Sequence, residues 1–165
     1  MPNPLIINHD NYTDRYILDI LRSVSNIAMV GASTNWKRPS NFVMKYLIQK
    51  GYRVIPVNKN SVGEQIYGET VYPDLAAVNE TVDMVEMFRP SKEAPQLVED
   101  AIKLNAKVFW MQLELRSDRA AKIAEDAGMK VVMNRCPKIE YARLFGELGW
   151  GGFNTGVISV KRRRI

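Results

Sequence analysis

Short apolar runs alternate with amphipathic helical segments along most of the chain, and this alternation constrains the fold more than any other feature. The runs expected to form strands are 26–30, 52–57, 83–88, 107–111 and 130–133. Runs such as Val-Phe-Trp-Met are apolar on both faces, which is typical of parallel strands covered by helices on both sides. We therefore predict an α/β fold, with a single Rossmann-like, doubly wound parallel sheet of about five strands.

The segments between these strands carry the start and stop signals of helices. Residues 11–24 include aliphatic side chains at i, i+3, i+4 and i+7, and they predict an opening amphipathic helix. Ser91 and Ser117 are expected to be the N-caps of two later helices. Gly128 is expected to be the left-handed residue that ends the second of these helices.

Composition and charge fit one globular domain. Hydrophobic residues make up 46% of the 165 residues and charged residues 25%, which excludes disordered and collagen-like chains. The net charge of +5 comes mainly from four consecutive cations at 161–164, so the rest of the chain does not predict a nucleic-acid-binding face. We expect one domain over 1–165, with a core at about 15–146 and a C-terminal extension with a basic tail at 147–165.

The scarcity of cysteine and histidine limits the possible chemistry. Cys136 and His9 are the single residues of their kinds, so an intramolecular disulfide is impossible and a metal site built from these residue types is not expected. The sequence has no apolar run of the ~18 residues that a membrane span needs, and it does not begin like a secretory signal. We expect a cytoplasmic protein that does not bind membranes.

The segment that follows the first predicted strand has the composition of an anion site. In a doubly wound sheet the ligand lies beyond the carboxyl ends of the strands. Backbone N–H groups, a helix N-terminus and nearby cations together attract phosphate there. Gly31, Ala32 and Ser33 would allow a ligand to approach the backbone closely. Hydroxyl groups come from Ser33, Thr34 and Ser40, and positive charge comes from Lys37 and Arg38.

The same segment departs from the nicotinamide-dinucleotide fingerprint. Ser33 and Trp36 occupy the positions of the second and third glycines in Gly-x-Gly-x-x-Gly. The second strand is followed by Asn58 and Lys59, without the acid that would hold a free ribose diol. These residues disfavour NAD and leave NADP or a 3′-phosphorylated adenosine such as coenzyme A as candidates.

Later strands are followed by further candidate residues. Arg89 and Pro90 follow the third strand, and Arg89 could clamp a phosphate, stack on an adenine or form a structural ion pair. Met111 and Gln112, at the end of the fourth, offer an adaptable apolar surface and a donor–acceptor amide. Cys136 follows the fifth strand between basic residues that would favour its thiolate, although a buried, inert thiol fits equally well.

Several strings resemble, in register, the small stand-alone CoA-binding domain proteins, which are similar to the N-terminal domain of succinyl-CoA synthetase alpha subunits. The strings are Val-Gly-Ala-Ser at 30–33, Arg-Pro-Ser at 38–40, Val-Ile-Pro-Val-Asn at 54–58, Phe-Arg-Pro at 88–90, Trp-Met-Gln at 110–112 and Arg-Cys-Pro-Lys-Ile-Glu-Tyr at 135–141. The resemblance spans about residues 15–146 and implies a Rossmann-like fold that binds coenzyme A.

The resemblance also implies positions for the parts of the ligand. The residues that it places near the pyrophosphate are Gly31, Ala32, Ser33, Lys37, Arg38, Pro39 and Ser40. Asn58 and Lys59 would lie near the adenosine, and Arg89 and Pro90 would form a wall. Met111 and Gln112 match the segment after the fourth strand of the synthetases. Relatives commonly have a glycine soon after Trp-x-Gln, where this chain has Leu-Glu-Leu at 113–115.

The expected function is binding rather than catalysis. No nucleophile–histidine pair or phosphate-loop motif is evident, and only His9 is available in place of the phosphorylated histidine of the synthetases. We expect a protein that binds coenzyme A or acyl-CoA as a sensor, a carrier or an enzyme partner, and that can form a homo-oligomer. The alternatives are an NADP-dependent oxidoreductase and a thiol-exchange enzyme that uses Cys136. The glycine-rich stretch at 149–156 receives no role.

Overall fold

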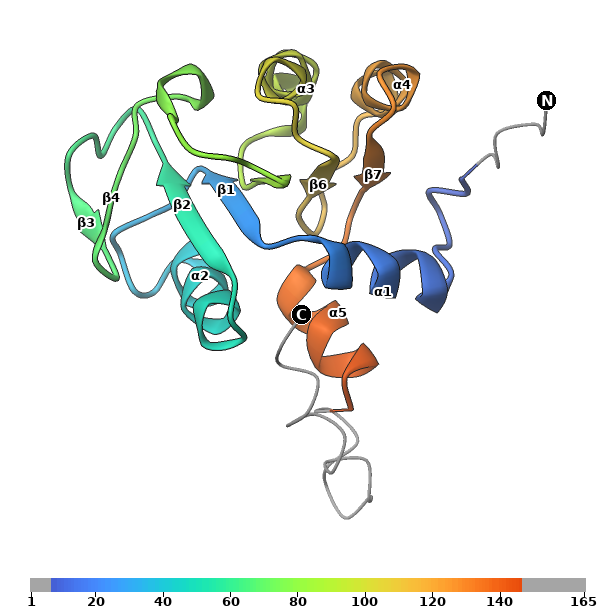
Figure 1. The fold of residues 1–165 in the computed structure, drawn as a ribbon, viewed down its shortest axis with the longest axis horizontal. Coiled ribbons are helices and arrows are strands. Elements are labelled where there is room, and N and C mark those ends of the chain that lie inside the picture. The colour runs from blue at the N-terminus through green and yellow to red at the C-terminus, as the bar shows by residue number, and fades with distance from the viewer. Residues whose placement is uncertain (1–6, 147–165) are drawn as a thin grey trace.

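The computed structural model describes residues 7–146, which form a five-stranded parallel sheet with helices on both faces (Figure 1). The strand order is β2-β1-β5-β6-β7. The strands are β1 (Asn26–Val30), β2 (Arg53–Val57), β5 (Met84–Met87), β6 (Val108–Met111) and β7 (Lys130–Val132). The predicted doubly wound, Rossmann-like sheet is confirmed. The expected C-terminal extension and basic tail lie outside the described residues.

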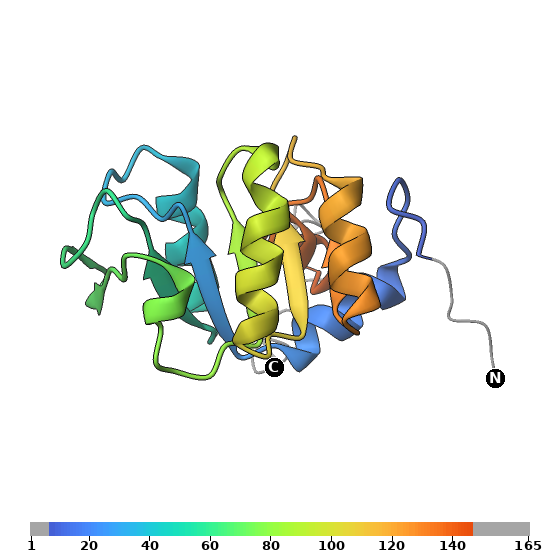
Figure 2. The ribbon, with the colours of Figure 1, turned by 90° about the horizontal axis from the view of Figure 1, so that it is seen from above.

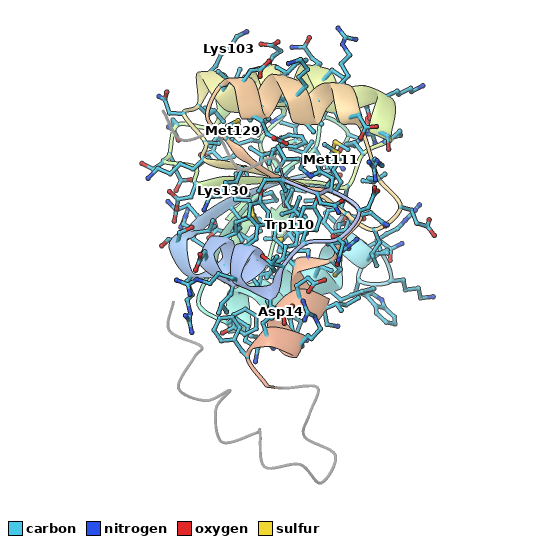
Figure 3. The ribbon with its side chains drawn as sticks, turned by 90° about the vertical axis from the view of Figure 1, so that its right-hand side faces the viewer. Asp14, Lys103, Trp110, Met111, Met129 and Lys130 are labelled. Atoms are coloured by element: carbon cyan, nitrogen blue, oxygen red, sulfur yellow. The ribbon has the colours of Figure 1, made fainter. Side chains whose placement is uncertain are left out.

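The helices divide the core into two apolar layers. Three of them, α1 (Asp14–Ser23), α2 (Pro39–Gln49) and α5 (Pro137–Leu144), cover one face of the sheet, as Figure 1 shows. The other face is covered by α3 (Ala94–Lys103) and α4 (Asp118–Asp126), which lie side by side in Figure 2. Neighbouring residues of a strand enter opposite layers, and Figure 3 shows this for Trp110 and Met111.

The strand order reverses between β1 and β5, because β2 lies on one side of β1 and the later strands lie on the other. The connection through α2 leads from β1 to β2 at one edge, whereas α3 and α4 lead from β5 towards β7 on the opposite face. Val30 pairs with Met87 at the carboxyl ends of these two adjacent strands. Ligands of open α/β sheets bind at such a switch point, so the loops after β1 and β5 are the place to look for a site.

The expected helix ends are confirmed in part. The hydroxyl of Ser117 accepts the N–H of Ala120 at 3.1 Å and caps α4, and Gly128 has a φ of +87° just beyond the end of this helix. The prediction that Ser91 caps α3 is wrong. Ser91 begins a 3₁₀ turn, η2 (Ser91–Glu93), and its hydroxyl instead accepts the N–H of Arg116 at 3.0 Å.

A short hairpin follows β2 and was not predicted. It consists of β3 (Gln65–Ile66) and β4 (Glu69–Thr70), and a 3₁₀ turn, η1 (Leu75–Ala77), follows it. Tyr67 and Gly68 form its turn, both with positive φ, which is the geometry of a two-residue hairpin. The hydroxyl of Tyr67 donates to Oδ1 of Asn41 and ties the hairpin to the first turn of α2.

Two tyrosines close the outer edge of β7. The Tyr16 hydroxyl accepts the N–H of Val131 at 3.1 Å and donates to its carbonyl at 2.9 Å. The Tyr12 hydroxyl accepts the N–H of Met133 at 2.8 Å, and burial raises the pKa of Tyr12 to about 12. These bonds satisfy backbone groups that an edge strand would otherwise leave open. Within residues 7–146, the helices are too short or too polar to cross a membrane.

Candidate functional site

Two adjoining hollows lie at the carboxyl edge of the sheet, where β1 and β5 end. The first, of about 390 Å³, is called the polar hollow and is lined by Gly31, Ser33, Arg38, Pro39, Ser40, Asn58, Phe88 and Arg89. The second, of about 150 Å³, is called the apolar hollow and is lined by Val30, Gly31, Val57, Asn58, Lys59, Pro73, Asp74, Leu75, Arg89, Glu93, Leu97 and Asp100. Gly31, Asn58 and Arg89 line both hollows, which therefore form one continuous site.

Gly31 lets the loop after β1 approach the loop after β5. Its φ is +90°, and its N–H donates to the carbonyl of Val57 at 2.8 Å. A Cβ at this position would lie 3.0 Å from the carbonyl oxygen of Phe88 and 3.2 Å from Cδ of Arg89. Glycine is therefore required by both the backbone conformation and the close approach of Phe88.

The loop after β1 is held by its own hydrogen bonds. The N–H of Ser33 donates to the buried hydroxyl oxygen of Ser40 at 3.1 Å, and the side-chain amide of Asn41 donates to the carbonyl of Ser33 at 2.8 Å. The hydroxyl oxygen of Ser33 accepts the N–H of Asn35 at 3.1 Å. The predicted phosphate loop is therefore a pre-formed turn anchored to the first turn of α2.

The start of α2 faces the polar hollow and favours an anion. Arg38 is the N-cap residue and Pro39 is the first residue of the helix, and the Arg38 side chain makes no capping hydrogen bond. Arg38 and Pro39 line the hollow together with Ser40. The positive end of the helix dipole and the Arg38 guanidinium therefore act in the same direction.

Asn58 joins the end of β2 to the loop after β1. Its side-chain N–H donates to the carbonyl of Ala32 at 2.8 Å, and its Oδ1 accepts the N–H of Asn60 at 2.9 Å. Lys59 is exposed and lines the apolar hollow. The sequence shows no acid directly after β2, but the structure brings Asp74 to the same hollow from the start of η1.

Arg89 forms an ion pair and also borders both hollows. Its Nε lies 2.9 Å from Oε2 of Glu93, one helical turn along the chain, and its side chain is 35% exposed. The sequence left open whether Arg89 forms a structural ion pair or faces a ligand site. In the structure it forms the ion pair and also borders the hollows. The apolar wall of the adjoining hollow comes from Val57, Leu75 and Leu97, which suit the flat face of an aromatic ring.

Other predicted residues lie apart from the two hollows. Lys37 is exposed with its ammonium over the Trp36 ring, and Pro90 is exposed beyond the hollow walls. Ala32 and Met111 are buried in opposite layers of the core. The side chains of these two residues therefore belong to the core, and neither residue lines a hollow.

Cys136 lies at the start of α5, and its side chain is 5% exposed. The basic residues beside it in sequence are engaged elsewhere. Arg135 lies over the Tyr12 ring, and Lys138 lies over the rings of Phe42 and Tyr46. The surroundings of Cys136 match the buried thiol of the two alternatives more closely than an exposed thiolate.

Sequence reasoning missed the acid in the middle of the sheet. Glu86 on β5 is completely buried, and burial raises its pKa to about 8. The signal was a single acid within the run Met-Val-Glu-Met, where a strand covered on both faces should be apolar. The described residues contain no cluster of three or more histidine, cysteine or acidic side chains that could hold a metal ion.

The arrangement can bind an elongated ligand with a flat, partly apolar end and an anionic centre. The apolar hollow would accept the flat end beside Lys59, and the polar hollow would accept the anion at the start of α2. The described residues of the two hollows include no histidine and no cysteine.

Comparison with known proteins gives matches over most of the chain. The sequence model of the CoA binding domain family matches residues 25–142, which contain both hollows. "Uncharacterized protein YneT" of Bacillus subtilis is 32% identical over 126 residues, which are 76% of this chain and 92% of that protein. A solved structure of a hypothetical protein from Pyrococcus horikoshii OT3 is 38% identical with a TM-score of 0.78, covering 88% of this chain and 99% of that chain.

A longer relative shares only part of its length. The alpha subunit of the ADP-forming acetate–CoA ligase I of Pyrococcus furiosus is 30% identical over 95 residues. These residues are 55% of this chain and 21% of that subunit. The resemblance that the sequence motifs predicted is confirmed.

Proposed function

Because the chain belongs to the CoA-binding domain family, we propose that it binds coenzyme A or an acyl-CoA at the two hollows. The adenine lies in the apolar hollow against Leu75 and Leu97, and the pyrophosphate lies in the polar hollow at the start of α2. Lys59 neutralises the 3′-phosphate of the ribose. The protein acts as a carrier, a sensor or an enzyme partner.

One observation carries this proposal: an apolar and a polar hollow join at the switch point of the sheet and share three residues. A nucleotide needs an apolar surface for its base and a concentrated positive field for its phosphates, one beside the other. The acetate–CoA ligase subunit that is similar to this chain has a name that refers to CoA, which supports the same ligand class.

Isothermal titration calorimetry with three ligands tests the proposal. Coenzyme A should bind more tightly than 3′-dephospho-coenzyme A, because a charged hydrogen bond to the 3′-phosphate contributes about 1.5–3 kcal/mol. NAD should bind weakest of the three. Lys59→Ala should remove the difference between the first two ligands, and Lys92→Ala, a nearby exposed lysine outside both hollows, is the matched control. Equal affinity of the wild type for coenzyme A and its dephospho form would contradict the role of Lys59.

A second variant tests the position of the phosphates. Ser33→Leu introduces a bulky side chain into the polar hollow and should abolish coenzyme A binding, while circular dichroism shows the fold intact. Arg38→Ala should weaken binding and flatten its dependence on salt, since a charge at the anion has been removed. Normal coenzyme A binding by Ser33→Leu would show that the phosphates lie elsewhere. NADPH, included in the same titrations, tests the oxidoreductase alternative.

A further inference from the structure

The carboxyl group of Glu86 lies in the apolar interior without a hydrogen-bond partner. Glu86 is completely buried on β5, between Met29 of β1 and Trp110 of β6 in the parallel ladder. Neither carboxyl oxygen takes part in a hydrogen bond with the described residues. An ionised carboxylate would be strongly destabilised there, because burial of an unpaired charge is much more costly than burial of a neutral polar group.

A second buried acceptor lies on the same face of the neighbouring strand. Oε1 of Gln112 is buried and makes no hydrogen bond within the described part of the chain. The N–H of Gln112 donates to the carbonyl of Met87 at 3.3 Å, so the ladder between β5 and β6 continues to this position. Gln112 therefore shares a face with Trp110, and it lies diagonally from Glu86 at a typical spacing of about 7–8 Å. Two long side chains can meet across this distance.

We propose that Glu86 is a positioning residue whose neutral carboxyl group donates its O–H to Oε1 of Gln112 and thereby turns the amide N–H₂ of Gln112 toward the ligand. This inference rests on the proposed function. With the adenosine beside β2 and the phosphates between β1 and β5, the pantetheine arm continues along the carboxyl edge to β6. There the Gln112 amide donates to a carbonyl oxygen of the arm. One proton on Glu86 then gives Oε1 of Gln112 a donor and engages one of the two carboxyl oxygens of Glu86.

The environment of Glu86 keeps its carboxyl group neutral at pH 7. Burial raises its pKa from the ordinary value of 4.5 to about 8, and burial is the cause of this rise. The elements packed over this face carry the titratable groups Tyr16 of α1, Tyr46 and Lys50 of α2, and Cys136, Lys138, Glu140 and Tyr141 of α5. Among these, Lys50 and Lys138 lie over tyrosine rings, and Glu140 pairs with Arg143. Burial alone accounts for the raised pKa of Glu86.

Infrared spectroscopy tests the protonation state without any ligand. The difference spectrum between the wild type and Glu86→Gln should contain the carbonyl stretch of a protonated carboxylic acid at pH 7. This band should disappear from the wild type as the pH rises past about 8. Absence of the band at pH 7 would overturn the proposal, because an ionised Glu86 would instead accept from a Gln112 amide turned inward.

Calorimetry with two ligands tests the effect on the pantetheine arm. Glu86→Leu and Gln112→Leu should each weaken coenzyme A binding about 3- to 10-fold, which corresponds to the loss of one hydrogen bond. Neither should change the affinity for adenosine 3′,5′-bisphosphate, which lacks the arm. The double variant should be no weaker than either single variant, because both changes break the same chain of hydrogen bonds.

The conservative variant separates positioning from packing. Glu86→Gln retains an N–H donor for Oε1 of Gln112, so it should bind coenzyme A like the wild type at pH 7 and keep that affinity at pH 9, where the wild type weakens. Equal weakening of both ligands by Glu86→Leu, or additive effects in the double variant, would refute the positioning role. Failure of the wild type to bind either ligand would refute the proposed function and the ligand contact, whereas the infrared band would still decide whether Glu86 is protonated.

Discussion

Replacing Gly31 with alanine measures how closely the loops after β1 and β5 approach. The added Cβ would lie 3.0 Å from the carbonyl oxygen of Phe88 and 3.2 Å from Cδ of Arg89, at a φ of +90°. The contact with Phe88 involves backbone, which cannot rotate away as a flexible side chain could. The two loops would have to separate for the methyl group to fit.

The matched control for this substitution is Gly63→Ala. Gly63 has a similar φ of +82°, but a Cβ there would meet nothing within 4 Å. An L-residue with positive φ costs about 1–2 kcal/mol, and this cost applies to both variants. Crowding against Phe88 adds about 1–3 kcal/mol at Gly31 alone. The free energy of unfolding should therefore fall by about 2–5 kcal/mol in Gly31→Ala and by about 1–2 kcal/mol in Gly63→Ala.

Urea denaturation gives both free energies, and calorimetry adds a functional measurement. Phe88 and Arg89 line the polar hollow, so their displacement in Gly31→Ala should weaken coenzyme A binding about tenfold or more. Gly63→Ala should bind like the wild type, since Gly63 lines neither hollow. An equal loss of stability in the two variants would refute the close approach, and unchanged coenzyme A affinity in Gly31→Ala would refute the placement of the phosphates.

Three further predictions concern other parts of the molecule. Between the ordinary pKa of 4.5 and the folded value of about 8, the folded state keeps a proton on Glu86 that the unfolded state releases. The free energy of unfolding should therefore fall as the pH rises across this window, by about 1.4 kcal/mol per pH unit more in the wild type than in Glu86→Gln. Denaturation at pH 5, 6.5 and 8 measures both, and parallel plots of stability against pH would contradict this prediction. Tyr16→Phe leaves the N–H and carbonyl of Val131 without their partner and should cost about 1–3 kcal/mol, whereas a cost near zero would show that water replaces the hydroxyl. Cys136 is 5% exposed, so native protein treated with oxidant and coenzyme A should form no mixed disulfide. Intact-mass spectrometry measures this, and an adduct on the wild type that is absent from Cys136→Ser would support the thiol-exchange alternative.

The strands of the sheet could be predicted because each is a short, strongly apolar run between turn signals. The helix caps are harder to predict, because a serine before a helical pattern can accept a hydrogen bond from another segment, as Ser91 does from Arg116. The hairpin β3–β4 was not predicted, because its strands have two residues each and are mostly polar. The positive φ of Tyr67 and Gly68, which identifies the turn in the structure, does not follow from these two residue types alone.

The residues that line the polar hollow could be predicted to lie together, whereas the apolar wall of the other hollow could not. Gly31, Ser33 and Arg38 belong to one continuous segment with a recognisable chemical pattern. Leu75 and Leu97 come from η1 and α3, and nothing in their local sequence distinguishes a wall of a hollow from ordinary core. Tertiary packing alone brings these segments beside the end of β1.

The polar groups of the site are already bonded to one another, and this decides how the site can recognise a ligand. Ser33 is held by Ser40, Asn58 holds the carbonyl of Ala32, and Arg89 is fixed by Glu93. A ligand therefore meets groups whose conformational entropy was lost on folding, so binding costs less. The side-chain donor of Asn58 is engaged by the loop, so this residue acts by shaping the loop after β1. In the proposed complex, recognition of the anion then depends on the helix dipole at the start of α2 and on the Arg38 side chain, which makes no capping hydrogen bond and borders the same hollow.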